Sequence, residues 1–434
     1  MSLATPDMIR RLQEALGTKA KQEPTYRFYL LYDKVYRADV LAHAYALAKQ
    51  RDGAPGVDGE TFEAIEAAGR ERWLAAMQEA LRTGTYRPQP VRRVRIPKPA
   101  GGERPLGIPT IRDRVVQTAV LLILQPIFEA DMEPTAYGYR PKRTAREAVE
   151  TAHRALCAGQ TQVVDADVSQ YFDTIPHAAL MQAVARRLSD RKLLRLLKRW
   201  LKAPVAEQTG RGGWRYTGGK RATQGIPQGG VISPLLANLY LNGLDHAVNE
   251  KCEQKPTMVR YADDLVILAK PGQGAGLQAR LKRWLEAREL KLNEEKTRLV
   301  DTRKEGFEFL GFAVAWRRSL RSGKRYVHVE PSAKSRTKLR DKVRAVLEVR
   351  TQNQPAVAVV RKVNQITRGW AAAFHYGNCT RVFAKQQIFV RNRLRRWLWR
   401  KSGRTHGLFE FFNHERLHGQ YQLWQWPRTA GWTT

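Results

Sequence analysis

The sequence has little cysteine and no long apolar run, and both absences exclude classes of protein. Its 434 residues include three cysteines, which lie far apart at Cys157, Cys252 and Cys379. They therefore build neither a disulfide framework nor a cysteine zinc site, and a reducing, cytoplasmic setting is the simplest interpretation. The most apolar stretch, residues 115–128, is shorter than the roughly 20 residues that span a bilayer. The N-terminus also lacks the apolar core of a signal peptide, so we expect a soluble protein with no membrane partner.

Acidic residues are scarce relative to basic ones. Lys and Arg number 76 against 41 Asp and Glu, which gives a net charge of +35 and a pI near 10.5. Such a field implies a polyanionic partner. The excess is concentrated in residues 331–434, which carry +17, whereas the first 330 residues carry +18.

The segment 391–401, RNRLRRWLWRK, alternates basic and apolar residues at helical spacing. Aromatic bodies beside arginines suit sugar and base surfaces as well as phosphates, so we expect this segment to bind RNA. A solvated helix face is the alternative for any single charge run. The expected RNA-binding residues are Arg391, Arg393, Arg395, Arg396, Arg400 and Lys401.

Hydrophobic periodicity and turn residues predict a mixed helix and strand chain of two to four structural units. We expect helices over 8–20, 36–51, 69–82, 112–128, 143–158, 177–201 and 232–250. Strands are expected over 91–98, 106–111, 161–168 and within 258–270, and the first two form a basic hairpin with a glycine turn. The one clear linker-like stretch is PGQGAG at 271–276, with weaker breaks at 321–324 and 351–355.

Two acidic clusters stand against apolar strand residues. In QVVDADV, Asp165 and Asp167 fall on one face because side chains repeat every second residue, and Asp167 lies where the strand ends. In MVRYADDLVIL, Asp263 and Asp264 lie at the tip of an expected hairpin. Carboxylates beside strands need a cation. A structural pair with Arg or Lys is one candidate, and divalent metal suited to phosphoryl transfer is the better fit.

Seven motifs together resemble one family, the bacterial group II intron reverse transcriptases or intron-encoded maturases. The resemblance runs from about GAPGVDG (53–59) to the C-terminal end, and RGWAAAFHYGN (368–378) is similar to the family's thumb or maturase segment. The seven motifs occur in the family's order: IPKPAGGERPLGIPTIRDRVVQ (96–117), AYGYRPKRTAREAV (136–149), DVSQYFDTI (167–175), QGIPQGGVISPLLANLYL (224–241), YADD (261–264), LKLNEEKT (290–297) and FEFLGF (307–312).

The resemblance implies an α+β right-hand polymerase with fingers, a palm built on an antiparallel sheet, and a helical thumb. The implied units are an N-terminal extension with the first fingers motif (1–64), fingers and palm (65–320), and a helical thumb or maturase domain (321–434). The implied function is RNA-directed DNA synthesis, linked to intron RNA binding and splicing. Many members of the family end in an endonuclease module with cysteine pairs, and this sequence has only Cys379 in its C-terminal part, so we expect the compact class without that module.

Two other functions stay open. A free-standing reverse transcriptase adopted by a host, in defence or in CRISPR spacer acquisition with adaptation proteins as partners, shares the chemistry. An RNA-binding splicing cofactor with a dead polymerase is the other, although such a protein would be expected to have lost YADD or Asp167, and both are intact.

The resemblance also implies roles for single residues. Asp167 and Asp263 would ligate two Mg²⁺ ions, with Mn²⁺ as a substitute, and Asp264 would support them. Lys296 resembles a lysine that serves as general acid for pyrophosphate, with a surface lysine as the alternative.

Four further residues would bind the incoming deoxynucleoside triphosphate, and the other implied partners are an RNA template and a DNA primer. Lys98 and Arg104 would hold the triphosphate, with generic solvated charge as the alternative. Phe172 would select deoxyribose, with a core phenylalanine as the alternative, and Gln228 would border the nucleotide.

Overall fold

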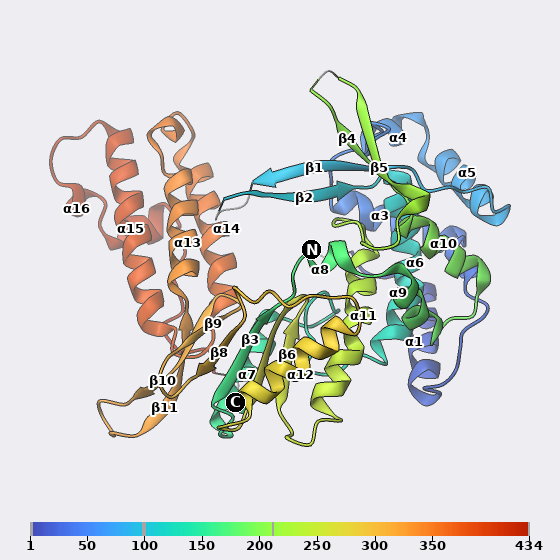
Figure 1. Ribbon diagram of the computed structural model, residues 1–434. Coiled ribbons are helices and arrows are strands. Elements are labelled where there is room, and N and C mark those ends of the chain that lie inside the picture. Colours follow the sequence, from blue (N-terminus) through green and yellow to red (C-terminus); the bar gives the residue numbers. More distant parts are fainter. Residues whose placement is uncertain (1–2, 98–100, 211, 433–434) are drawn as a thin grey trace.

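The protein is described by a computed structural model over residues 3–97, 101–210 and 212–432. Figure 1 shows a shape like an open hand. A sheet and its helices lie at the bottom, a second sheet lies across the top, and a helical bundle lies on the left. The described elements confirm the predicted α+β right-hand architecture with an antiparallel palm sheet and a helical thumb.

The palm is a four-stranded antiparallel sheet in the order β6-β7-β3-β8. Alternate residues of its strands pack into two cores, one toward helices α11 and α12 and the other toward α7. The elements are α7 (Ala145–Cys157), β3 (Gln162–Asp167), α11 (Ser233–Asn249), β6 (Thr257–Tyr261), β7 (Asp264–Ala269), α12 (Gly274–Glu286) and β8 (Arg298–Asp301). Both faces of the sheet are thus covered along most of its length, and polar side chains gather at one end of it.

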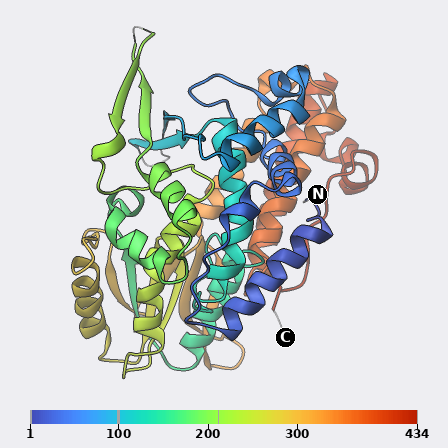
Figure 2. The ribbon, with the colours of Figure 1, turned by 90° about the vertical axis from the view of Figure 1, so that its right-hand side faces the viewer.

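The fingers contain a second sheet in the order β2-β1-β4-β5, set above helices from the N-terminal third. Helix α6 is apolar on nearly all sides because α1 and α3 pack against it within the core, and Figure 2 shows α1 along the outer side. The strands are β1 (Val91–Pro97), β2 (Glu103–Ile108), β4 (Pro204–Gln208) and β5 (Trp214–Gly218). The helices are α1 (Asp7–Gln22), α2 (Tyr32–Val35), α3 (Ala38–Gln50), α4 (Phe62–Ala68), α5 (Arg70–Arg82), α6 (Ile111–Glu129), α8 (Tyr171–Thr174), α9 (His177–Ala185) and α10 (Arg191–Leu201).

A small antiparallel sheet leads from the palm into the thumb. Its strands, in the order β11-β10-β9, pack with α7 in the palm's second core, and the three long helices that follow form a separate core of their own. The elements are β9 (Phe307–Phe309), β10 (Phe312–Arg318), β11 (Arg325–Pro331), α13 (Ala333–Val346), α14 (Ala356–Phe374), α15 (Thr380–Ser402) and α16 (Leu408–Phe411).

One expected helix is wrong. The predicted helix over 177–201 is two helices, α9 and α10, because Asp190 ends the connection between them as an N-cap. Its Oδ1 accepts hydrogen bonds from the backbone N–H groups of Lys192 and Leu193. Its Oδ2 accepts hydrogen bonds from the backbone N–H groups of Leu31 and Tyr32. A carboxylate that satisfies four amides stabilises a break that helical periodicity alone does not reveal.

Other differences concern boundaries. The predicted linker at 271–276 is shorter than expected, since α12 begins at Gly274. The break at 321–324 is the turn of the β10–β11 hairpin, so the predicted boundary at 320/321 falls inside a hairpin and the predicted boundary at 64/65 falls inside α4. The β4–β5 hairpin and the β9–β11 sheet were not predicted.

Candidate active site

The palm sheet brings the predicted aspartates together at one end. Strand β3 ends at Asp167, which lies directly opposite Asp264 in the antiparallel register with β7. Paired residues project to the same face of a sheet, so the two carboxylates are cross-strand neighbours. Asp263 lies beside them in the turn between β6 and β7, as the sequence predicted. This turn includes Ala262 in the left-handed region, at φ 61°.

Asp165 also shares this face, but it has its own cation. Arg298 on β8 reaches Asp165 at 3.6 Å. Burial raises the pKa of Asp165 and the arginine opposes that rise. The structural ion pair considered from the sequence therefore applies to Asp165.

Asp167 is held from the segment that follows α12. The Asn293 amide group donates to Asp167 Oδ2 at 3.1 Å, and the Asn293 backbone N–H donates to the Asp167 carbonyl at 2.8 Å. The Lys296 ammonium lies 3.3 Å from the same Oδ2, although 67% of its side chain stays exposed. The structure thus brings Lys296 to the aspartates as expected from the motif, and it adds Asn293, which sequence reasoning missed within the same motif.

The electrostatics of the aspartates fit a hard cation. Surrounding protein atoms desolvate Asp264, and repulsion from Asp263, Asp167 and Asp165 adds to this effect, so that its pKa rises to about 6. Carboxylates that repel one another in this way are stabilised by cations that prefer oxygen ligands, such as Mg²⁺. The donor set therefore suits divalent metal ions.

A buried network fixes the turn that carries Asp263. The Arg260 guanidinium is 1% exposed and pairs with Asp245 on α11 through hydrogen bonds of 2.8 and 2.5 Å. It also donates to Asn238 Oδ1 and to the Ala262 carbonyl inside the turn, at 2.8 and 3.0 Å. The signal in the sequence is an arginine inside an otherwise apolar strand, which requires a buried acid nearby.

Gly138 completes this support from the opposite side. Its carbonyl accepts from Asn238 at 2.7 Å, and a Cβ at this position would lie 2.2 Å from the backbone nitrogen of Ala262. The segment before it runs beside β6, since Tyr137 N–H donates to the Arg260 carbonyl. Only glycine permits this approach of two backbones, so the AYGYRP motif shapes the turn.

Two of the predicted nucleotide residues, Arg104 on β2 and Gln228, contact each other. Arg104 Nε donates to Gln228 Oε1 at 3.0 Å, and Gln228 Nε2 donates to Asp173 Oδ2 at 3.1 Å. Asp173 was not singled out from the sequence. Lys98 lies outside the residues that the structure describes.

Phe172 is 8% exposed and belongs to the core cluster of the palm. Its ring nevertheless meets Tyr139 edge to face, with centroids 6.5 Å apart. Tyr139 is 48% exposed, and Asp263 is among the charges acting on it. Phe172 therefore lies under the rim of the site, and this position is consistent with both roles considered from the sequence.

Comparison with known proteins agrees with this arrangement. Residues 96–314 match the family described as reverse transcriptase (RNA-dependent DNA polymerase). Residues 336–414 match the group II intron, maturase-specific domain. The chain belongs to the group II intron reverse transcriptases.

Several curated proteins are similar in sequence to long stretches of this reverse transcriptase. Protein YkfC of Escherichia coli K12 is 35% identical over 368 residues, which are 76% of this chain and 94% of that protein. The group II intron-encoded protein LtrA of Lactococcus lactis is 30% identical over 380 residues, 72% of this chain and 61% of LtrA. The putative COX1/OXI3 intron 1 protein of Saccharomyces cerevisiae is 26% identical over 331 residues, 64% of this chain and 38% of its own length. The reverse transcriptase thus spans about three fifths of LtrA.

The predicted RNA-binding residues lie on α15 of the thumb but differ in their contacts. Arg396 and Arg400 are exposed. Arg395 instead donates to the Phe412 carbonyl at 2.7 Å and lies over the Phe409 ring. The Lys401 ammonium donates to the Gln352 carbonyl at 2.6 Å, and Arg391 and Arg393 are half-buried. Arg395 is therefore engaged within the thumb in this structure, whereas Arg396 and Arg400 face solvent.

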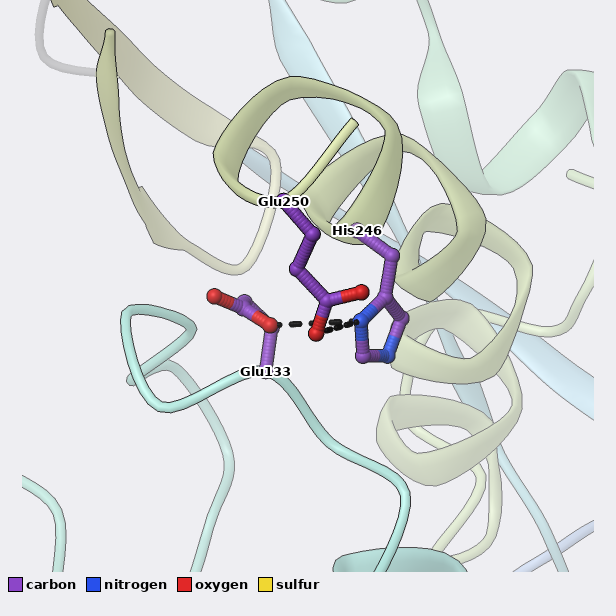
Figure 3. Close-up of side chains that lie close together, drawn as sticks. All are labelled: Glu133, His246 and Glu250. Carbon is purple, nitrogen blue, oxygen red and sulfur yellow. Dashed lines mark ion pairs between the residues drawn. The ribbon is translucent and has the colours of Figure 1, made fainter. Parts of the chain in front are cut away.

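A second titratable cluster lies away from these aspartates. Among the described residues, Glu133, His246 and Glu250 are the one group of three possible metal ligands whose atoms all lie within 4.8 Å of one another (Figure 3). His246 Nε2 donates to the Asp131 carbonyl, and Nδ1 lies 3.2 Å from Glu133 and 3.0 Å from Glu250. Burial disfavours the imidazolium, but this hydrogen bond and the two carboxylates outweigh it and raise the pKa of His246. The cluster is explained as ion pairs that join the end of α11 to the segment following α6.

The helices of the described chain include none that is both long and apolar enough to cross a membrane.

Proposed function

We propose that Asp167, Asp263 and Asp264 hold two Mg²⁺ ions and that the reverse transcriptase extends a DNA primer along an RNA template at this site. One observation carries the proposal. Asp167 and Asp264 are paired across β3 and β7 with Asp263 in the adjoining turn, and the repulsion among these carboxylates contributes to raising the pKa of Asp264 to about 6. When bound, the ions would activate the primer hydroxyl and neutralise the leaving pyrophosphate.

The neighbouring side chains position the reactants. Asn293 orients the Asp167 carboxylate, and Lys296, whose ammonium lies 3.3 Å from Asp167 Oδ2, is the proposed donor of a proton to pyrophosphate. Arg104 and Gln228 are hydrogen-bonded to each other. Arg104 is proposed to bind the triphosphate, and Gln228 to border the incoming nucleotide. Lys98, which follows β1 in the sequence, is also proposed to bind the triphosphate. Positioning and charge stabilisation are the main requirements of phosphoryl transfer.

The test is extension of a DNA primer annealed to an RNA template, with deoxynucleoside triphosphates and Mg²⁺. We expect product on RNA templates, none after chelation of the ion, and recovery on restoring Mg²⁺ or adding Mn²⁺. RNA binding should survive chelation, because the basic surface supplies most of the affinity. A folded chain that binds RNA but adds no nucleotide would instead support the splicing cofactor alternative.

Phe172 is proposed to select deoxyribose from below the incoming nucleotide. Replacing Phe172 with valine should raise ribonucleotide incorporation relative to deoxynucleotide incorporation by about tenfold or more, because the ring no longer occupies the space of the 2′-hydroxyl. The quantity to measure is the ratio of kcat/KM for the two sugars. Phe312→Val, at a ring of the β9–β11 sheet that is 1% exposed, is the control for loss of a core phenylalanine. An unchanged sugar ratio in an active Phe172→Val enzyme would make Phe172 a core residue only.

The thumb supports a second activity, assistance of intron splicing. Its helices carry the maturase-specific match, and residues 331–434, about a quarter of the chain, have the denser positive charge. We propose that group II intron RNA binds here and that the intron is also the physiological template. A host-adopted enzyme would share the polymerase and would fail to accelerate splicing of any such intron.

The exposed arginines of α15 should make the affinity for intron RNA depend on salt concentration. Each lost phosphate contact flattens the slope of log affinity against log salt by about 0.7 to 0.9 units. Replacing Arg396 and Arg400 by glutamine should therefore flatten the slope by roughly 1.5 units. It should weaken splicing more than single-nucleotide addition, because the aspartates are elsewhere.

The control removes the same charge from a helix of the palm. Lys282→Gln with Arg283→Gln on α12 should leave the salt slope near that of the wild type. Arg395→Gln should mainly lower thermal stability, since this side chain bonds to the Phe412 carbonyl. An unchanged slope in the Arg396 and Arg400 variant would mean that these arginines form only a solvated helix face.

A further inference from the structure

A groove between two helices of the fingers lies outside the candidate active site. Its volume is about 710 Å³, and its two long walls are α9 and α10, which lie on the side of the molecule away from the thumb helices (Figure 1). The lining is mainly apolar and includes Ala178, Met181 and Ala185 of α9 and Leu194 of α10. We call this feature the α9–α10 groove. Cavities of this volume hold small organic molecules.

The walls of the α9–α10 groove are fixed before any ligand binds. Leu193 and Leu197 of α10 are fully buried in the main core and anchor that helix. A third wall includes Thr223, whose carbonyl accepts from the His177 backbone N–H at 2.8 Å. His177 Nε2 also donates to the Gly225 carbonyl at 2.7 Å. A preformed site spends little binding free energy on ordering its own side chains.

Two exposed cations also line the α9–α10 groove. Residues 191–202 contain six Lys or Arg and no Asp or Glu. Of these, Arg195 and Lys198 line the groove, are exposed and form no ion pair with any described residue. Burial, together with repulsion from Arg87 and Arg195, lowers the pKa of Arg199 on the same helix. An anion bound beside Arg195 would offset part of this repulsion.

The lining suits an organic anion better than a nucleic acid. The described lining residues include no Phe, Tyr or Trp on which a base could stack. A phosphate backbone would use the cations and leave Met181 and Leu194 in water. A molecule with an apolar body and one anionic group uses both features, because its body covers these side chains while the anion meets Arg195 and Lys198.

We propose that the α9–α10 groove binds an amphiphilic organic anion, a small molecule with an apolar ring body and one sulfonate or carboxylate group. The body lies against Met181 and Leu194, and the anionic group pairs with Arg195 and Lys198. Binding at this site requires neither the polymerase nor the splicing activity.

The experiment titrates the full-length protein with anilinonaphthalene sulfonate, a fluorescent probe that has this chemistry. We expect saturable binding at one site per chain, with a dissociation constant on the order of tens of micromolar, as is usual for a ligand of this size. Phenylnaphthylamine has the same rings without the sulfonate, and it should bind at least about fivefold more weakly.

The first variant adds a negative charge to the groove. Ala178 is exposed in the first turn of α9, where a glutamate is compatible with the helix. Ala178→Glu should weaken binding of anilinonaphthalene sulfonate about tenfold or more, because its carboxylate repels the sulfonate. The control is Ala275→Glu, at an exposed alanine in the same position of α12 and outside the groove, and it should stay within about twofold of the wild type.

The second variant removes the cations. Arg195→Gln with Lys198→Gln should weaken binding of anilinonaphthalene sulfonate about fivefold or more and leave binding of phenylnaphthylamine within about twofold. Arg191→Gln with Lys192→Gln removes the same charge from the same helix outside the groove lining, so affinity for both probes should stay within about twofold. Thermal melting of every variant checks that altered binding does not report partial unfolding.

Two results would overturn the inference. Wild-type affinity for anilinonaphthalene sulfonate in folded Ala178→Glu would place the probe elsewhere on this basic protein. Displacement of the bound probe by a saturating short single-stranded RNA would make the groove part of an RNA-binding surface. Retention of the probe in the presence of that RNA, with loss of binding in the two groove variants alone, supports a separate site for an organic anion.

Discussion

Asp263→Asn should reduce primer extension on an RNA template on the order of a thousandfold while changing RNA affinity little. An amide cannot supply the charge that a divalent ion at this position requires, and losing several kcal/mol of charge stabilisation lowers the rate by that factor. The variant should fold normally, because Asp263 lies in a turn that is held through Arg260 and the Ala262 carbonyl rather than through its own side chain.

The measurement is the initial rate of single-nucleotide addition, alongside filter binding of the same RNA. A matched control is Asp165→Asn, which changes a carboxylate on the same face of β3 that is already paired with Arg298. We expect its rate to stay within about tenfold of the wild type. If Asp263→Asn also stayed within about tenfold, Asp263 would not be part of the catalytic site.

The positions of the aspartates could be predicted because they depend on local patterns. The alternation of side chains in QVVDADV predicts a strand with Asp165 and Asp167 on one face. The four small or polar residues between two apolar runs predict a turn at Ala262 and Asp263. Both features depend on side-chain period and turn chemistry within a few residues. That Asp165 pairs with Arg298 depends on the place of Arg298 beside β3, which is set by the tertiary pairing of β8.

The features that escaped prediction depend on partners distant in the chain. The break between α9 and α10 needs the amides of Leu31 and Tyr32, more than 150 residues away from Asp190. The β5 strand, WRYTG, is exposed along its whole length and lacks the apolar alternation by which strands are recognised.

The buried pair of Arg260 and Asp245 should be the most sensitive structural element of the palm. Each side chain is 1% exposed, so removing one partner leaves an unpaired charge in the interior. We expect Asp245→Leu or Arg260→Met to lower the free energy of unfolding by about 3–5 kcal/mol, measured by urea denaturation. The exposed pair Lys282–Glu294 is the control, since Lys282→Met should leave the free energy of unfolding nearly unchanged.

The double variant Arg260→Met with Asp245→Leu separates stability from activity. Replacing both charges removes the unpaired charge, so the double variant should recover at least half of the lost free energy of unfolding. Its primer extension should stay low, because the bond from Arg260 to the Ala262 carbonyl is also gone and the turn bearing Asp263 loses its anchor. A double variant that regained wild-type extension would show that the network serves stability alone and that the turn is positioned by Gly138 and Asn238 without it.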